Sequence, residues 1–308
     1  MSDPHIVLHG GFHKTATSHI QSLLMRNVKH LHRRGVTYVH HRHTRKQLTI
    51  PCMSNAYQKV GIGWKPVIDD AELAALADKF FGRVMDAAAP RLILSDENFA
   101  GHCGHCIRDG SLYPFRDHLL GALAGVVPIP VREVHLGIRN YADFFSSAYI
   151  EFLRSASANS FLADDVMKRQ VLDQGAGWHS AITSCIEHFP AARVHVWRYE
   201  DFRQIEPVIM ANLCGPTVDV GRFKSPGTEN KRPSASGRAV QELLQIARVQ
   251  GPGAALEQWR ELQERFPRGA RWAAYDPWSP PERSHLTALY EKDVAAIATD
   301  PRIILVRP

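Results

Sequence analysis

The sequence has no apolar run long enough to cross a membrane. No stretch of its 308 residues approaches the roughly 18 to 20 uninterrupted apolar residues that a transmembrane helix needs. Residues 1–5 lead directly into a short apolar segment, without the basic and apolar regions of a secretory signal peptide. The five cysteines are odd in number and irregularly spaced, which favours a reducing compartment over a disulfide framework. We therefore expect a cytoplasmic protein with no membrane span.

Strong charge and internal repetition are also missing. The formal net charge is only +6, and no fixed-period repeat or low-complexity tract is evident, which excludes repeat architectures. The mild positive excess favours a polyanionic ligand such as a phosphorylated nucleotide or an acidic glycan, or it serves solubility alone. The length fits one large α/β domain or two small domains.

Short β-branched runs alternate with longer helical patterns over the first two thirds of the chain. The runs cover residues 6–8, 36–39, 92–94, 134–138 and 194–197, and helical patterns cover 18–29, 70–87, 141–154 and 178–188. This alternation predicts a parallel sheet of about five strands with helices on both faces, a three-layer α/β sandwich of P-loop-like type.

The last third has helical patterns at residues 235–249, 254–266 and 282–298. A Gly-Pro-Gly break and a Trp- and Pro-rich stretch separate them. We expect a helical cap over roughly 235–308 that folds onto the sheet, so that residues 1–308 form a single domain.

The segment after the first β-branched run has the composition of an anion-binding loop. The pair Gly10-Gly11 frees the backbone, and a helical pattern follows. Uncovered amide groups at a helix start attract negative charge. Lys14 adds a positive charge, and three hydroxyl donors follow it: Thr15, Thr17 and Ser18. A plain strand–turn–helix corner is the alternative, but helix capping does not need three hydroxyls after a lysine.

This loop differs from the nucleoside-triphosphate P-loop, G-x-x-x-x-G-K-[ST]. His13 stands before Lys14 where that motif has glycine, and the four-residue spacer between glycines is missing. Asp96 and Glu97, after the third run, could serve as an acidic strand end that binds Mg²⁺. A Mg-dependent kinase or NTPase therefore stays open as an alternative, and so does a non-catalytic anion-binding protein.

The six residues His13-Lys14-Thr15-Ala16-Thr17-Ser18 resemble the 5′-phosphosulfate loop of the sulfotransferase family, whose pattern is close to [PH]-K-[TS]-G-T-[TS]. Ala16 stands where the family usually has glycine, and it is strained there if the site needs a positive φ. A second segment resembles the family's 3′-phosphate segment, in which an arginine at a strand end precedes a serine by eight residues. Arg139 and Ser147 have this spacing, and arginine offers a planar fork to a phosphate.

Two weaker matches complete the resemblance, which covers positions 6 to about 232. Residues 197–202 resemble the family's Y-E-D strand end, which implies that Tyr199 lies near the adenine. Asn230 and Arg232 fall where the family places a late loop against the 3′-phosphate. The resemblance, closest to bacterial carbohydrate sulfotransferases, implies that 3′-phosphoadenosine 5′-phosphosulfate (PAPS) donates a sulfuryl group. The implied acceptor is a hydroxyl or amine, on a glycan or glycolipid.

Sulfuryl transfer needs a group that stabilises the departing phosphate and a base for the acceptor. We expect Lys14 and the loop amides to stabilise the negative charge on the phosphate oxygen. The transferred group carries less charge than a phosphoryl group, so we expect no metal. Glu97 is the first candidate for the base, since it ends a strand at the carboxyl edge of the sheet. It could instead be a helix cap or an ion-pair partner. The rival bases are histidines: His40, His41, His43 and His102.

Two further clusters suggest other sites, of which we expect neither a zinc site nor a nucleic-acid face. Residues 102–106 read His-Cys-Gly-His-Cys, but a lone C-x₂-C pair without a second pair is a weak zinc signal. Residues 33–46 gather basic side chains and histidines around Tyr38, as in a nucleic-acid face or a rim for an acidic glycan. No set of stacking aromatic residues accompanies this charge, so we expect no nucleic-acid partner.

Overall fold

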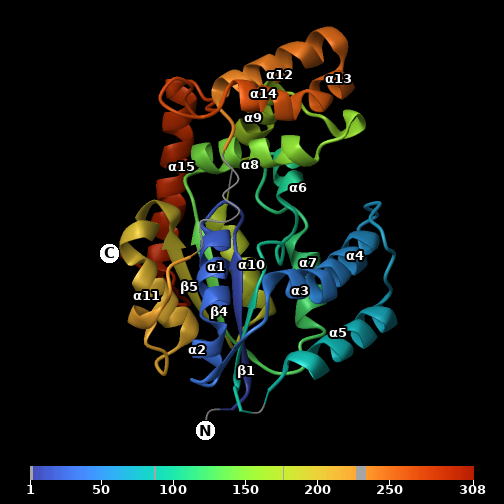
Figure 1. The fold of residues 1–308 in the computed structure, drawn as a ribbon. Coiled ribbons are helices and arrows are strands. Elements are labelled where there is room, and N and C mark those ends of the chain that lie inside the picture. The colour runs from blue at the N-terminus through green and yellow to red at the C-terminus, as the bar shows by residue number, and fades with distance from the viewer. Residues whose placement is uncertain (1–2, 87, 176, 227–233) are drawn as a thin grey trace.

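A six-stranded parallel sheet lies at the centre of the computed structural model, which describes residues 3–86, 88–175, 177–226 and 234–308 (Figure 1). The strand order is β2-β3-β1-β4-β5-β6, and every neighbouring pair is parallel. The strands are β1 (His5–Gly11), β2 (Val36–Tyr38), β3 (Arg91–Ser95), β4 (Val131–Ile138), β5 (Arg193–Arg198) and β6 (Ile303–Val306).

Side chains of each strand alternate between two apolar layers. In β1, Ile6 and Leu8 face one layer and Val7 faces the other, and all three are buried. The Val7 side is covered by α1 (Thr17–Arg26), α2 (Val28–His32) and α11 (Phe202–Cys214). The other side is covered mainly by α5 (Asp70–Val84), α7 (Arg116–Ala124) and α10 (Trp178–His188). The predicted three-layer α/β fold is confirmed.

Other helical segments precede the cap in the chain. They are α3 (His41–Thr44), the π-helical turn η1 (Arg45–Thr49), α4 (Ile50–Lys59), α6 (Cys103–Asp109), α8 (Tyr141–Ser155) and α9 (Asp164–Gln174). Three 3₁₀ turns cover Ala158–Ser160, Tyr199–Asp201 and Val220–Arg222. Among the described residues, no helix combines the length and apolar character that a bilayer span requires.

The predicted helical cap consists of α12 (Gly237–Gln250), α13 (Pro252–Glu257), α14 (Trp259–Arg265) and the long α15 (Pro280–Thr299). In Figure 1 the first three lie above α8, and α15 runs down beside the sheet. The Trp278 indole holds the cap on α8 by donating to the Ala142 carbonyl at 2.9 Å and to the Ser146 hydroxyl at 3.1 Å.

The end of this region contains a short strand that the sequence pattern did not indicate. Residues 303–306 form β6, which pairs with β5 and adds a sixth strand to the expected five. Ile303 and Val306 are nearly buried, whereas Ile304 is 43% exposed, so the run covers one edge of the sheet. The sheet order places β1 between β3 and β4, so the residues that follow these three strands meet at one edge, which we call the carboxyl edge.

Candidate active site

The loop between β1 and α1 presents a row of unpaired amide groups. Within the described part of the chain, the backbone N–H groups of residues 14–18 have no hydrogen-bond acceptor. Lys14 (φ 64°) and Ala16 (φ 72°) adopt left-handed conformations, which turn successive amides toward one concave side. Such a concavity at the start of a ten-residue helix favours an anion. Ala16 thus has a positive φ, the case in which the sequence analysis expected an alanine at this position to be strained.

Gly11 allows this loop to approach the end of β3. Its φ is 96°, and a Cβ atom there would lie 3.1 Å from the Thr17 hydroxyl and 3.3 Å from the Glu97 Cα. A side chain at this position would push the loop away from Glu97. The glycine thus brings the anion loop and the predicted base against each other.

The threonine hydroxyls of the loop point inward. Thr15 Oγ1 donates to the Phe12 carbonyl at 2.5 Å, and Thr17 Oγ1 donates to the same carbonyl at 3.1 Å. Both side chains are buried and brace the loop, so in this geometry their hydroxyls do not face a ligand. Ser18 is exposed on the first turn of α1. The donors that face outward are therefore the amides, Lys14 and Ser18.

His13 supports the loop without adding charge. Its backbone N–H donates to the Tyr113 hydroxyl at 3.1 Å, and its Nδ1 lies 3.0 Å from the same oxygen. Burial, together with the neighbouring His102, lowers the pKa of His13 to about 3. The imidazole is therefore neutral near pH 7 and contributes by positioning the loop.

Lys14 contacts a carboxylate that the sequence analysis missed. Its Nζ lies 3.5 Å from Glu151 Oε2 on α8, and Arg154 Nη1 donates to the same oxygen at 3.1 Å. Ser147 lies one helical turn before Glu151 and so shares its face of α8. Following the helical period onward from Ser147 could have identified Glu151 from the sequence.

Arg139, just after β4, reaches the loop. Its Nη1 donates to the Lys14 carbonyl at 3.0 Å, and its guanidinium lies over the Tyr199 ring at 4.5 Å. The Trp178 indole donates to the Arg139 carbonyl at 2.8 Å and fixes the backbone. Arg139 Nε is buried and has no partner in the described part of the chain. Two motifs 125 residues apart thus meet at the carboxyl edge, together with Tyr199.

Two other predicted residues cannot be placed. Asn230 and Arg232 lie outside the described residues, so their predicted contact with a 3′-phosphate stays a prediction. Ser147 is half-buried in the second turn of α8.

Glu97 lies at the loop, as its position after β3 predicted. Its Oε1 accepts a hydrogen bond from Arg45 Nη2 at 3.2 Å. Burial raises the pKa of Glu97, while the charges of Arg45 and Lys14 act in the opposite direction. The carboxyl group is therefore a weak acid close to the anion loop, which suits a group that accepts a proton.

The Asp96 carboxylate is held by hydrogen bonds from other side chains of the protein. It is fully buried, and it accepts hydrogen bonds from Arg45 Nε at 3.1 Å and Nη2 at 2.7 Å and from the Asn98 side chain at 2.9 Å. A guanidinium thus occupies the place where a kinase would need its magnesium ligand to face a metal. This arrangement weighs against the kinase alternative.

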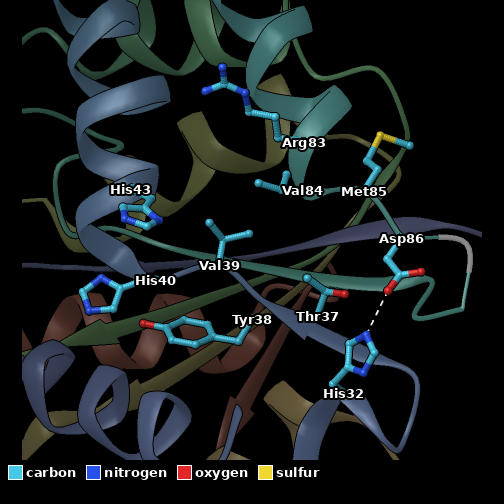
Figure 2. A pocket seen from close by; sticks show the side chains of 10 residues that line it. All are labelled: His32, Thr37, Tyr38, Val39, His40, His43, Arg83, Val84, Met85 and Asp86. Atoms are coloured by element: carbon cyan, nitrogen blue, oxygen red, sulfur yellow. Dashed lines mark hydrogen bonds and ion pairs between the residues drawn. The ribbon is translucent and has the colours of Figure 1, made fainter. Parts of the chain in front are cut away.

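Two of the rival histidines, His102 and His41, have properties that weigh against a role as the base. His102 Nδ1 accepts the Gly104 amide at 3.0 Å, so the neutral ring carries its proton on Nε2 and has no lone pair to spare. Burial, with His40 next to it, lowers the pKa of His41 to about 4. Figure 2 shows His40 and His43 on the wall of a cavity of about 450 Å³ along β2, a cavity that Tyr38 and Arg83 also line.

The His-Cys-Gly-His-Cys segment begins α6 and buries its thiols. Cys106 Sγ accepts the Tyr113 amide at 3.3 Å, and burial raises the pKa of Cys106 to about 12. Burial also raises the pKa of Cys103 well above its usual range. Protonated thiols are poor metal ligands, since the thiolate is the form that binds.

Within the described residues, possible metal ligands lie within 4.8 Å of one another at Glu133, His135 and His195, and the residues of the His-Cys-Gly-His-Cys segment form no such group. The two imidazole rings stack 4.6 Å apart at an angle of 5°, so one ion cannot lie in the plane of both rings. Arg91 also holds the Glu133 carboxylate through two hydrogen bonds. The arrangement fits a buried polar network better than a metal site.

The fold and this edge define a P-loop-like α/β protein with a cationic loop after β1. No protein-family model and no curated protein matches the chain. Among solved structures, the chain is similar to a sulfotransferase from Alicyclobacillus acidocaldarius, with 12% identity and a TM-score of 0.39, over 88% of this chain and 98% of that one. A likeness this distant assigns no activity.

Proposed function

We propose that this protein is a sulfotransferase that moves a sulfuryl group from PAPS to an acceptor hydroxyl or amine. The observation that carries the proposal is the meeting of two separate cationic elements at the carboxyl edge. One is the loop at residues 14–18, whose amides have no acceptor among the described residues, and the other is Arg139, which touches that loop. A nucleotide with a phosphosulfate at one end and a 3′-phosphate at the other needs two such anion sites.

The fit of such a donor is supported by polar groups that have no partner within the part of the chain that the structure describes. The loop amides can surround the 5′-phosphosulfate, and the buried Nε of Arg139 can donate to the 3′-phosphate. Tyr199, beneath the Arg139 guanidinium, offers an aromatic surface next to this group. Ser147, and Asn230 and Arg232 by resemblance, complete the proposed binding residues.

Lys14 and the amides would act on the leaving group. Negative charge grows on the phosphate oxygen as the sulfuryl group departs, and fixed donors aimed at that oxygen lower the barrier. Holding both ends of the donor also fixes the sulfur for attack. The Lys14 ammonium lies 3.5 Å from Glu151 and has three N–H donors, so it would contact the donor's oxygen beside or in place of that carboxylate.

Glu97 would accept the proton of the attacking hydroxyl or amine. Its backbone packs against Gly11, and its carboxylate lies among the charges of Lys14 and Arg45. Positive charge in this proposal comes from Lys14, Arg45 and Arg139, so no metal is assigned a role.

The acceptor class that we propose is a carbohydrate or glycolipid. Support comes from the hydrogen-bonding side chains gathered between residues 33 and 46, some of which line the cavity beside β2.

The contacts of Trp278 with α8 also support the view of residues 1–308 as one domain.

Calorimetric titration with 3′-phosphoadenosine 5′-phosphate tests the donor, with and without Mg²⁺ and beside ATP. We expect Mg²⁺-independent binding that is tighter than binding of ATP. Lys14→Met and Arg139→Met should each weaken it by roughly tenfold or more, since each removes a charged donor to phosphate. The matched controls, Lys79→Met on α5 and Arg248→Met on α12, are exposed and should change nothing.

Two results would contradict the proposal. Binding of ATP that requires Mg²⁺ and is lost in Asp96→Asn would identify a kinase or NTPase. Binding of the bisphosphate without transfer from PAPS to any of a panel of sugars, alcohols and amines would identify a non-catalytic anion-binding protein.

A further inference from the structure

Arg45 reaches into the site from outside the predicted motifs. It begins η1 (Arg45–Thr49), a π-helical turn between α3 and α4. Single π-helical turns inside helices occur frequently at functional sites, because the extra residue redirects a side chain. Here the turn directs the guanidinium to the two acidic residues that follow β3.

The guanidinium is fixed on one side and reaches Glu97 on the other. Nε and Nη2 bind Asp96 as a fork, and Asp96 is itself held by the amide and the side chain of Asn98. The same Nη2 donates to Glu97 Oε1 at 3.2 Å. Because Asp96 is fully buried while 24% of the Glu97 side chain is exposed, the anchored pair is Arg45–Asp96 and the carboxylate that it orients is Glu97.

Several charged or titratable groups face Glu97 from the surrounding elements. They are Arg45 from η1, Lys14 from the loop after β1, Asp96 from its own strand end, His102 and Cys103 from the start of α6, and Tyr113. Burial lowers the pKa of His102 and raises that of Cys103 and Tyr113, so these three are neutral near pH 7. The positive charges that oppose the burial of Glu97 are thus Arg45 and Lys14.

These two cations would not be equally available during the proposed reaction. An anionic donor in the loop takes the charge of Lys14 and brings further negative charge toward Glu97. Burial and Asp96 already raise the pKa of Glu97. A base must be deprotonated when the acceptor arrives, so the remaining cation decides whether Glu97 can act.

We propose that Arg45 is a positioning residue that, anchored by Asp96, aims the Glu97 carboxylate at the acceptor and keeps it charged when the donor is bound. This inference rests on the proposed function of the site and adds to it a residue that acts through Glu97.

The direct test is a titration of Glu97 by carbon NMR of ¹³C-labelled glutamate, with Glu97→Gln to assign the signal. Arg45→Met should raise the pKa of Glu97, because a positive charge within hydrogen-bond distance is lost. Arg45→Gln keeps a donor for Asp96 without the charge and should also raise it. Arg45→Lys should leave the pKa near the wild-type value. The control, Arg42→Met, removes an exposed arginine on α3 and should leave it unchanged.

Rates of transfer from PAPS, measured across pH, then distinguish the effect of the Arg45 charge on Glu97 from its effect on the orientation of the carboxylate. In Arg45→Gln, the acid side of the kcat profile should move to higher pH. The rate below the midpoint should fall roughly tenfold for each pH unit by which that midpoint rises. In Arg45→Lys, the profile should stay in place while kcat falls at every pH, because an ammonium cannot hold Asp96 as a fork and still reach Glu97. The KM for PAPS should change little in both.

An unchanged pKa of Glu97 in folded Arg45→Gln would overturn the inference and leave Arg45 a purely structural partner of Asp96. Should Arg45→Met not fold, Arg45→Gln and Arg45→Lys decide the question, since each can still donate to Asp96. The NMR titration needs neither donor nor acceptor. A failure of PAPS transfer would therefore refute the proposed function, whereas a fixed pKa would refute the role of Arg45.

Discussion

At the amino ends of the strands, Arg91 on β3 and Glu133 on β4 form a buried ion pair, whereas at the carboxyl ends Arg45 reaches two carboxylates beyond β3. Arg91 donates to both oxygens of Glu133, at 2.8 and 2.6 Å, and to the carbonyls of Asn212 and Leu213. The two side chains are only 12% and 7% exposed. Every acceptor around this arginine is a fixed part of the protein, so the cluster is closed.

At the carboxyl edge an arginine also binds carboxylates, but this cluster is partly exposed to solvent. Arg45 is 36% exposed and divides its donors between a buried and a partly exposed carboxylate. The amides of residues 14–18 lack acceptors within the described residues, and two of these residues have strained backbones. Polar groups whose hydrogen bonds are all made within the protein stabilise the fold, whereas groups with a free hydrogen-bond donor can bind a ligand. This difference between the two ends of one sheet supports placing the proposed site at the carboxyl edge.

The largest effect that would distinguish the two ends of the sheet should come from Glu97→Gln, which should change activity at the carboxyl edge. We expect it to lower transfer from PAPS by roughly 10² to 10⁴-fold, the usual contribution of a positioned base, without weakening binding of the bisphosphate product. Steady-state rates and calorimetry measure the two effects. The exposed Glu257→Gln on α13 is the matched control, and near-normal turnover in Glu97→Gln would assign the base to another residue.

At the amino ends, Arg91→Met should act on stability. Removing one partner of a buried ion pair leaves the other charge unpaired, so the free energy of unfolding should fall by about 3 to 5 kcal/mol. Urea denaturation at pH 7 measures this loss. Arg193 lies 3.6 Å from the same carboxylate but is 72% exposed, so Arg193→Met should change stability by less than about 0.5 kcal/mol. Equal losses in both variants would show that burial does not distinguish them.

Acid should affect the two ends with opposite sign. Burial alone would raise the pKa of Glu133, but hydrogen bonds from His135 and Arg91 lower it far below the usual range. Its ionised form therefore stabilises the fold above a pH of about 4.3, the unfolded pKa, and this contribution is lost as the pH falls toward the folded pKa. The raised pKa of Glu97 has the reverse effect, because the fold binds that proton more tightly than the unfolded chain does.

Denaturation between pH 3 and 7 tests both signs. Glu133→Gln should lose less stability on acidification than the wild type does. Glu97→Gln should be more stable than the wild type at pH 7. A Glu133→Gln variant with an unchanged acid dependence would contradict the first sign, and a destabilised Glu97→Gln would contradict the second.

The smallest expected effect concerns backbone strain in the loop. Ala16 has a φ of 72°, where an alanine costs about 1 to 2 kcal/mol, so Ala16→Gly should raise the free energy of unfolding by about 1 kcal/mol. Ala74 is an exposed helical alanine in α5, and Ala74→Gly should lower it by about 1 kcal/mol. Urea denaturation of the two variants should thus give opposite signs, and a loss in both would mean that the loop is unstrained.

Local patterns predicted most of the fold. Alternating apolar runs and helical periods placed five strands in a layered parallel sheet, because burial imposes those periods. The same reasoning missed β6. Its four residues follow shortly after the 20-residue helix α15, and no helix comes after them to complete the alternation of strand and helix. Its partner β5 lies about 100 residues away in sequence, and no local pattern reports such a pairing.

The site could be predicted only where one segment carries the chemistry. Loop composition indicated Lys14 and the family resemblance indicated Arg139, but neither could show that the Thr15 and Thr17 hydroxyls turn toward Phe12. Arg45 was missed because its partners lie 51 and 52 residues further along the chain. Contacts of this kind depend on how a turn is wound, and residue type alone does not determine that.

The central position of β1 has a consequence for the protein during synthesis. Both of its partners, β3 and β4, come later in the chain, and about 80 residues separate the end of β1 from the start of β3, the first of them. At a translation rate of roughly 5 to 20 residues per second, about 4 to 16 s pass before β3 begins to be made. Ile6, Val7 and Leu8 stay without a neighbouring strand throughout this interval. The middle of the finished sheet is thus an apolar segment that must wait for its partner strands during synthesis.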